Sequence, residues 1–410
     1  MRRVRLDWVT TVSRQAVDVA NLDSAEVFHY SIPVIEATGD GAVERTEHID
    51  SSKLLLEGGE VLISKLNPRK ARVLIAQAHE IPTVCSGEFI PLVPQPDIDR
   101  QFLWWRLSSN DVTQELGSQV RSVTRSHQRI DPIVLTKLWF DLPSLDEQKR
   151  ISAFLDSKCA DIDELLQEMA TQRALLDERR SALITMSLSG VFSGNHDLVE
   201  SGIPWIGHIP SHWEVMRLKH LGRASIGLTY SPTDVVEDPS EGTLVLRSGN
   251  IQNGRISLED NVFVRTPVPS HLRTLEGDIL ICVRNGSVRL IGKSAVITDE
   301  MAGVTWGAFM SVFRSPMNQY LSWVLRSSIF SQQLGLFATS TINQLTNATL
   351  HNFQVPVPPE DERRSLVRAL EDECGRIDDL EAELERSTAL LNERKTAIIT
   401  TAVTGQMEVA

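Results

Sequence analysis

Two stretches decide the fold: PSLDEQKRISAFLDSKCADIDELLQEMATQRALLDERRSALITMSLSG (143–190) and PPEDERRSLVRALEDECGRIDDLEAELERSTALLNERKTAIITTAVTG (358–405). With one more residue at the start, 142–190 and 357–405 align without a gap, and 18 of the 49 pairs are identical. A repeat of this length, unlike the short period of a solenoid, indicates a duplicated module. A chain built from two similar halves is expected to bind a target that also has two halves.

Each repeated segment is predicted to form one long helix. An apolar residue recurs every seven positions in both segments, and this period specifies a coiled-coil seam. Further leucines widen the stripe, so each helix should pack against the other and keep a face for a third partner. The predicted seam consists of Leu155, Ile162, Met169, Leu176, Leu183, Leu370, Ile377, Leu384, Leu391 and Ile398.

The ends of both helices carry the same signals. A proline followed by Asp-Glu, at 146–147 and at 361–362, places negative charge in the first turn, where the helix dipole favours it. Gly190 and Gly405 follow the last apolar turns and fit helix C-caps. About 40 helical residues at 1.5 Å each would form a spacer of roughly 60 Å.

The segments that precede the two helices also resemble each other. Gly, Pro and Asn interrupt short Val/Ile-rich runs, a pattern typical of mixed domains rich in strands and loops. The fold class is therefore α+β, with two globular mixed domains joined by two long helices. The matched pairs are GGEVLIS (58–64) with EGDILIC (276–282), SGEFIPL (86–92) with WGAFMSV (306–312), and FLWWRL (102–107) with YLSWVL (320–325).

The composition is that of an ordinary globular protein, with a net charge of −13. No apolar run approaches the ~20 residues of a membrane helix, and the basic start lacks the apolar core of a signal peptide, so a cytoplasmic location without membrane contact is expected. The four scattered cysteines predict reduced, partly buried thiols. The negative charge is concentrated in the repeated segments, and the mixed domains are near neutral, so charge neither requires nor excludes DNA binding.

Several motifs together resemble the specificity (S) subunits of type I restriction–modification systems. IPWIGHIPSHWEVMRLKHLG (203–222) is similar to the opening of a target-recognition domain of that family, followed in the family's order by LRSGNIQNGRI (246–256) and EGDILICVRNG (276–286). The two repeats resemble its helical regions. The first half lacks the IPWIG leader and the Gly-Asn-Ile run, which is consistent with two domains that read different sequences. The predicted boundaries are 1–141 for target-recognition domain 1, 142–194 for helical region 1, 195–356 for target-recognition domain 2 and 357–410 for helical region 2.

The resemblance implies a non-catalytic DNA sequence-specificity subunit of a host-defence system. Each recognition domain would read one half of a bipartite, asymmetric site on double-stranded DNA, and the helices would pack as an antiparallel coiled coil that sets the gap. Two methyltransferase (M) subunits would dock on this scaffold and carry S-adenosylmethionine, so this chain itself needs no cofactor or metal. A nuclease/translocase (R) subunit is an optional further partner.

Two other functions are weighed against this interpretation. A self-sufficient DNA methyltransferase or nuclease would need a catalytic motif, but there is no N/D-P-P-[FYW] run, and IGKS (291–294) does not complete a phosphate-binding loop because Gly286 lies one residue too far from Gly292. A coiled-coil adaptor that binds no DNA would not need two loop-rich domains.

The residues expected to contact DNA lie in polar loops after the matched strands and in a segment before each helix. Lys and Arg can bind phosphates, and Arg or Asn can also pair with base edges. Arg125 and Arg129, four residues apart, would form one basic helical face; ordinary solvated surface is the alternative interpretation for all of these residues. The full set is Lys65, Asn67, Arg69, Lys70, Arg72, Arg125, Arg129, Arg284, Asn285, Arg289, Lys293 and Asn343.

Overall fold

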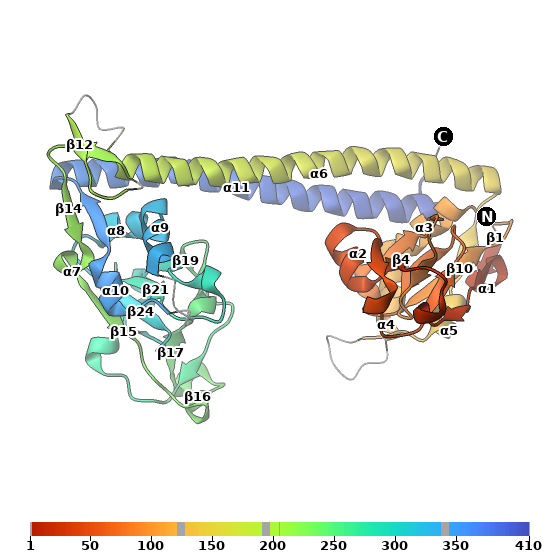
Figure 1. Cartoon of the computed structure of the whole chain (residues 1–410), viewed down its shortest axis with the longest axis horizontal. Coiled ribbons are helices and arrows are strands. Elements are labelled where there is room, and N and C mark those ends of the chain that lie inside the picture. The colour runs from red at the N-terminus through yellow and green to blue at the C-terminus, as the bar shows by residue number, and fades with distance from the viewer. Residues whose placement is uncertain (1, 121–127, 191–196, 205, 338–343, 410) are drawn as a thin grey trace. The chain divides into compact units, whose positions relative to one another are not determined.

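A computed structural model describes residues 2–120, 128–190, 197–204, 206–337 and 344–409. The chain folds into two compact units: Met1–Ala170 with Leu384–Ala410, and Thr171–Glu383. Each unit consists of one strand-rich domain and part of both long helices, so both ends of the chain belong to the first unit (Figure 1). The α+β class, with two mixed domains and two long helices, is confirmed.

The domain of the first unit contains two main sheets. One sheet is antiparallel, and in the other a parallel pair lies inside an otherwise antiparallel arrangement. The first has the order β2 (Thr10–Val12), β10 (Phe89–Pro94), β7 (Val61–Ser64), β8 (Val73–Ile75). The second has the order β3 (Ala16–Val17), β6 (Lys53–Leu56), β9 (Thr83–Cys85), β4 (Glu26–Tyr30), β5 (Ala42–Arg45).

The domain of the second unit repeats this plan. Its antiparallel sheet has the same strand order, and its other main sheet again contains a parallel pair. The antiparallel sheet consists of β15 (Arg223–Ile226), β24 (Met310–Arg314), β21 (Ile279–Cys282), β22 (Ser294–Val296). The other consists of β16 (Val235–Val236), β20 (Phe263–Val264), β17 (Thr243–Leu246), β23 (Thr305–Trp306). Two small hairpins pair β12 (Leu198–Glu200) with β13 (His208–Pro210) and β18 (Ile251–Gln252) with β19 (Arg255–Ile256).

The strand that leads to each predicted DNA-contact loop is buried on both faces. In β7, Val61 and Ile63 belong to the main core of the first unit, whereas Leu62 belongs to a second cluster on the opposite face. In β21, Ile279 and Ile281 face the main core of the second unit, and the residues between and after them face another cluster. Successive side chains of a strand point to opposite faces, so burial of both faces explains why each run is continuously apolar.

Each domain begins and ends on neighbouring strands. β1 (Arg2–Arg5) pairs with β11 (Trp139–Leu142), and β14 (Glu214–Arg217) pairs with β25 (Gln354–Val357), directly before the long helices. Short helices accompany the sheets, and each of them except α2 has a counterpart in the other domain. They are α1 (Leu6–Val9), α2 (Ile32–Thr38), α3 (Arg100–Ser108), α4 (Asn110–Ser118) and α5 (Pro132–Thr136), then α7 (Leu218–Leu221), α8 (Asn318–Leu325), α9 (Ser328–Phe337) and α10 (Asn347–Asn352).

The ladder register shows which positions of the two domains are equivalent. Ser64, the last residue of β7, pairs with Phe89, and Cys282, the last residue of β21, pairs with Met310. Phe89 is therefore equivalent to Met310, whereas the sequence match aligned it with Phe309. That alignment of 86–92 with 306–312 is wrong by one residue, because the phenylalanine that the two runs share is a buried strand residue in the first domain, Phe89, and an exposed turn residue in the second, Phe309.

The two repeats form α6 (Leu145–Leu188) and α11 (Glu360–Val403). Their first turns carry the acidic residues expected from the dipole argument. Gly190 and Gly405 follow the helix ends in the left-handed conformation, at φ 73° and 71°, which confirms the predicted C-caps. At Gly190 a side chain would also collide with Pro210, whose Cδ lies 2.4 Å from the position of an added Cβ.

In each unit a part of α6 lies antiparallel against a part of α11 (Figure 1). In the first unit Asp163 contacts Lys395, and Met169, further along α6, contacts Thr388, earlier in α11. In the second unit Arg180 contacts Asp378. All ten predicted seam residues are buried or half-buried.

Each main core is closed by helix segments from both repeats. In the first unit, Leu155 and Cys159 of α6 and Ile399, Ala402 and Val403 of α11 all belong to the domain core. The second unit reverses the roles, with Ile184 and Leu188 from the end of α6 and Val367, Leu370 and Cys374 from the start of α11. Apolar burial therefore ties each helix pair to its own domain.

The segment after α6 is fixed to the start of α11. Trp213 is 5% exposed, and its Nε1 donates a hydrogen bond of 2.7 Å to Glu362 Oε2. His212 Nε2 contacts the other oxygen of the same carboxylate at 2.7 Å. Trp213 thus fastens this segment within the second unit. Among the helices described, none has both the length and the apolarity to cross a membrane.

Candidate nucleic-acid interface

The two predicted DNA-contact segments of the first domain lie together. The loop after β7 meets the segment before α5 through a bridge between Leu66 and Arg129. The Asn67 N–H donates to the Gln128 carbonyl at 2.7 Å, and the Ile130 N–H donates to the Lys65 carbonyl at 3.1 Å. These two segments are far apart in the sequence, and the fold brings them together into one surface.

The second domain contains the equivalent junction. Arg284, after β21, forms a bridge with Gln344, before α10, and the Leu345 N–H donates to the Val283 carbonyl at 2.7 Å. Arg129 and Gln344 therefore occupy equivalent places. Because Arg129 lies in an extended bridge, the prediction of a helical face through it is wrong at this residue. Arg125 and Asn343 lie outside the described residues.

Two of the predicted DNA-contact residues are held by a carboxylate of their own domain. Glu36 of α2 accepts a hydrogen bond from Lys70 Nζ at 2.6 Å and forms an ion pair with Arg72. The hydrogen bond from Lys70 has the largest effect, and together with Arg72 it lowers the pKa of the Glu36 carboxyl from 4.5 to about 2. The Arg72 side chain is 7% exposed and also donates to the Leu66 carbonyl at 2.9 Å, so its guanidinium shapes the loop from inside. Its contact with DNA stays a prediction.

The other predicted residues fall into exposed and half-buried sets. Arg69 and Arg289 are exposed, whereas Lys65 and Lys293 are half-buried. The Lys293 carbonyl accepts a hydrogen bond from the Cys282 N–H, and the Arg72 carbonyl accepts one from the Ser64 N–H. Because Cys282 and Ser64 are equivalent, Lys293 is the counterpart of Arg72. Asn67 adopts the left-handed conformation, with φ 49°, which asparagine tolerates better than most residues.

Two arginines have different partners at this junction. In the first domain, Arg129 Nε and Nη2 each donate to the Glu88 carboxylate at 3.0 Å. In the second, the guanidinium of Arg284 lies over the ring of Phe309, 5.1 Å from its centroid, and Phe309 is 59% exposed. Sequence reasoning missed Glu88 and Phe309, since neither a glutamate nor a phenylalanine in a turn is distinctive by itself.

A pocket of about 580 Å³ opens beside the Arg284 loop. Ser248 and Phe309 line it, and Asn285 Nδ2 donates to Ser248 Oγ at 3.1 Å. Arg247 and Asp260, which form an ion pair at 2.8 Å, supply its charged groups. The loop therefore borders a concave surface that offers both aromatic and charged groups.

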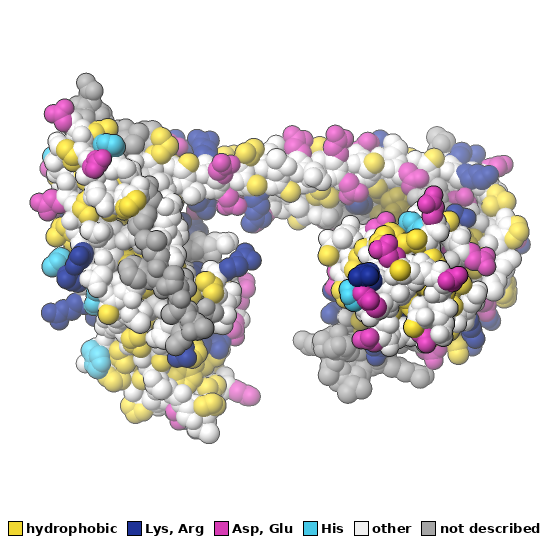
Figure 2. Space-filling model, viewed as in Figure 1, with side chains coloured by type: hydrophobic (Ala, Val, Ile, Leu, Met, Phe, Trp, Pro, Cys, Tyr) yellow, Lys and Arg dark blue, Asp and Glu magenta, His cyan; other side chains and the backbone are white. Residues whose placement is uncertain are grey.

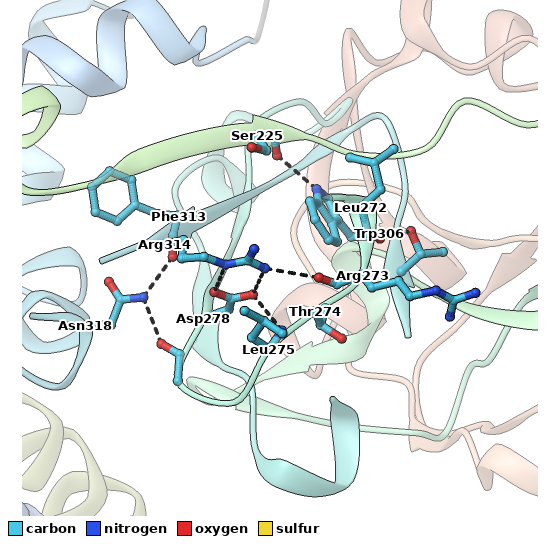
Figure 3. A network of polar contacts seen from close by, with 12 residues as sticks. Ser225, Leu272, Arg273, Thr274, Leu275, Asp278, Trp306, Phe313, Arg314 and Asn318 are labelled. Carbon is cyan, nitrogen blue, oxygen red and sulfur yellow. Dashed lines mark hydrogen bonds and ion pairs between the residues drawn. The ribbon is translucent and has the colours of Figure 1, made fainter. Parts of the chain in front are cut away.

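A buried ion pair fixes the opposite end of β21 (Figure 3). The side chain of Asp278 is 2% exposed, and Arg314 donates to its two oxygens at 2.8 and 2.6 Å. Asn318 Nδ2 donates to the Gly277 carbonyl at 2.8 Å and ties α8 to the same turn. A buried carboxylate is tolerated when it is paired and hydrogen-bonded, and this network ties the start of β21 to β24 and α8.

The charges on the surface are mixed. Figure 2 shows acidic and basic side chains interspersed along α6 and α11 and over the visible face of each unit. The four cysteines are free thiols, as predicted, but they are fully rather than partly buried, and burial raises the pKa of Cys85 to about 12 and that of Cys159 to about 11. Within the described ranges, no three His, Cys, Asp or Glu side chains are grouped so as to hold a metal ion.

Comparisons with known proteins agree with this architecture, although no family model matches the chain. The chain is 25% identical over 207 residues to the EcoKI type I restriction enzyme specificity subunit of Escherichia coli K12, covering 49% of this chain and 44% of that protein. It is 21% identical over 396 residues to the MjaVIII specificity subunit of Methanocaldococcus jannaschii, covering 93% and 87%. A solved chain, from a study of complex assembly and conformational transition of the type I R-M system, matches with a TM-score of 0.74 at 19% identity, covering 99% of this chain and 98% of that one.

The resemblance to type I specificity subunits is confirmed, since the curated homologues of this chain are such subunits. The chain spans a little under half the length of the EcoKI subunit and of the Salmonella potsdam StySPI subunit, and most of the archaeal one. The structural match extends over nearly the whole chain and supports the two-domain fold with its paired helices.

Proposed function

We propose that this chain is the DNA sequence-specificity subunit of a type I restriction–modification complex and has no catalytic role of its own. Each domain reads one half of a bipartite, asymmetric site on double-stranded DNA. The observation that carries this proposal is the pair of domains whose four-stranded antiparallel sheets have the same strand order and whose equivalent loop positions hold different side chains. Duplication provides two recognition domains, and the different side chains in their loops allow each domain to recognise its own half-site.

The long helices set the gap between the half-sites in this proposal. Each contains 44 residues, which at about 1.5 Å per residue corresponds to roughly 66 Å of helix. Because both helices contribute to the core of each unit, a domain cannot move relative to its own helix ends without breaking apolar packing. Rigid attachment is what a spacer requires.

Two methyltransferase subunits dock on the chain and bring S-adenosylmethionine. Symmetry supports the number two, because the helices carry large exposed leucines at equivalent repeat positions. Leu165 and Leu390 are 45% and 65% exposed in the first unit, and Leu175 and Leu380 are 58% and 46% exposed in the second. Exposed apolar side chains of this kind suit protein–protein contact. A nuclease/translocase subunit is an optional addition to the same assembly.

Footprinting of the chain assembled with its methyltransferase tests the proposal. We expect protection of two short DNA blocks separated by unread base pairs. A contiguous footprint, or none, would rule the proposal out and leave the protein-binding adaptor. The purified chain alone should neither methylate nor cut DNA; either activity would support the self-sufficient enzyme instead.

A further inference from the structure

Three equivalent positions meet where the central strand of each domain ends. They are defined here as the junction triad: Leu66, Glu88 and Arg129 in the first domain, and Arg284, Phe309 and Gln344 in the second. The backbone is the same in both, since the Lys65 N–H donates to the Glu88 carbonyl at 2.8 Å and the Val283 N–H donates to the Phe309 carbonyl at 3.0 Å. The third position closes each triad through its bridge to the first.

Both triads place one guanidinium against the side chain of the second position. In the first domain that guanidinium belongs to the third position, Arg129, and it lies against Glu88. In the second domain it belongs to the first position, Arg284, and it lies against Phe309. The arginine comes from a different chain segment in each domain, yet it reaches the same partner position.

The carboxylate of Glu88 orients Arg129 for recognition. Nε and Nη2 face the carboxylate, so Nη1 and the second N–H of Nη2 point away from it, and the Arg129 side chain is 56% exposed. A guanidinium held in this two-point arrangement loses less conformational freedom on binding. Its outer edge has the geometry that pairs with O6 and N7 of guanine in the major groove.

Phe309 orients Arg284 by another means. The ring supports the guanidinium from below through a cation–π contact, which leaves the in-plane N–H groups available. No carboxylate pairs with Arg284 in the part of the chain that the structure describes. The neighbouring Gln344 adds an amide that can both donate and accept.

We infer that Arg129 and Arg284 each read a guanine, one in each half-site, and that Glu88 and Phe309 are the positioning residues that determine this specificity. The inference rests on the proposed function. The two arginines come from different chain segments. The guanine that each one reads therefore lies at a different position within its half-site. In this way the two triads contribute to the asymmetry of the DNA site.

The test is to sequence methylated adenines in DNA from cells that make the full chain with its methyltransferase partner. Glu88→Gln should relax one guanine position of one half-site by about tenfold and leave the other half-site unchanged. Phe309→Leu should relax one guanine position of the other half-site only. Arg129→Ala and Arg284→Ala should abolish the preference at the same two positions.

The unaffected half-site in each variant is an internal control for folding. A purely structural role for Glu88 or Phe309 would lower methylation at all sites equally and leave base preference intact, and that result would overturn the inference. If the wild-type chain directs methylation at a two-part motif and none of the variants changes that motif, the inference is overturned while the proposed function stands. A wild-type chain that directs no two-part motif would overturn both.

Discussion

Arg180 of α6 donates to Asp378 of α11 at 2.6 Å, and the same guanidinium donates to Glu381 at 2.9 Å. Lys395 and Asp163, the repeat counterparts of Arg180 and Asp378, form the equivalent pair in the first unit. The duplication has thus preserved a cross-helix ion pair in each unit. The pairs differ in burial: the side chains of Arg180 and Asp378 are 17% and 36% exposed, whereas those of Lys395 and Asp163 are 27% and 55% exposed. The second partner of Arg180, Glu381, is 18% exposed.

This difference predicts unequal stability effects. Arg180→Ala removes the cation that faces the largely buried carboxylate of Glu381, whereas Asp378 keeps its ion pair with Arg255, and the change should cost about 2 kcal/mol. Lys395→Ala removes a more solvated pair and should cost about 0.5 kcal/mol. Hydrogen–deuterium exchange over 171–188 with 360–383, and over 155–170 with 384–403, measures the two costs separately. Equal costs would show that burial does not distinguish the two pairs.

A side chain at Gly190 should destabilise the end of α6. Gly190→Ala combines a positive φ of 73° with a collision at Pro210, so we expect a loss of about 2–3 kcal/mol. Gly202→Ala is the matched control, since its φ is 72° but nothing lies within 4 Å of the added Cβ. The control should cost about 1 kcal/mol. Thermal unfolding of both variants measures the difference, and equal losses would exclude a steric role for Pro210.

The loop that holds Lys70 and Arg72 should loosen in acid. The folded-state pKa of Glu36, about 2, lies below its ordinary value of 4.5, so the ionised carboxylate contributes stability above pH 4.5. That contribution is lost progressively as the pH falls from 4.5 towards 2. A carbon-13 NMR titration of the Glu36 carboxyl should give a midpoint near 2, and Lys70→Ala should move it upwards. A wild-type midpoint at 4.5 would contradict the ion pairs.

The exposed leucines should determine how many methyltransferase subunits bind. Leu165→Asp combined with Leu390→Asp places charge on the docking surface of the first unit only. We expect the affinity for a methyltransferase subunit at that site to fall by at least about tenfold, so that one subunit binds instead of two. The equivalent Leu175 and Leu380 remain intact and serve as the control. Native mass spectrometry of the assembled complex measures the stoichiometry. Two bound subunits in the double variant would place the docking surface elsewhere.

The elements that the sequence predicted well are those whose packing repeats along the chain. The seven-residue period specified α6 and α11 because one apolar face of each is buried or half-buried along the helix. The runs 58–64 and 276–282 were matched because both faces of β7 and β21 are buried, which constrains every residue. Before β10 and β24 the match of 86–92 with 306–312 slipped by one residue, because it paired Phe89, which is buried, with Phe309, which is exposed.

The junction triads were beyond sequence reasoning for a related reason. Glu88 and Arg129 are 41 residues apart, and only the pairing of β10 with β7 and the bridge from Leu66 bring them together. Arg284 was predicted as a DNA contact from its residue type and loop position, and Arg129 as part of a basic helical face. Their equivalence was hidden because the guanidinium comes from different segments in the two domains.

The central claim, that paired helices hold two readers at a fixed spacing, is tested most directly by changing the helices. Four residues inserted after Gln172 and four after Ser387 lengthen the pair by about 6 Å, close to two base pairs of DNA. The same insertion after Glu237, in an exposed bend of the second domain, is the control. Sequencing of methylated adenines should show both half-sites unchanged and the gap about two base pairs longer in the helix variant alone. An unchanged gap in that variant would contradict the account.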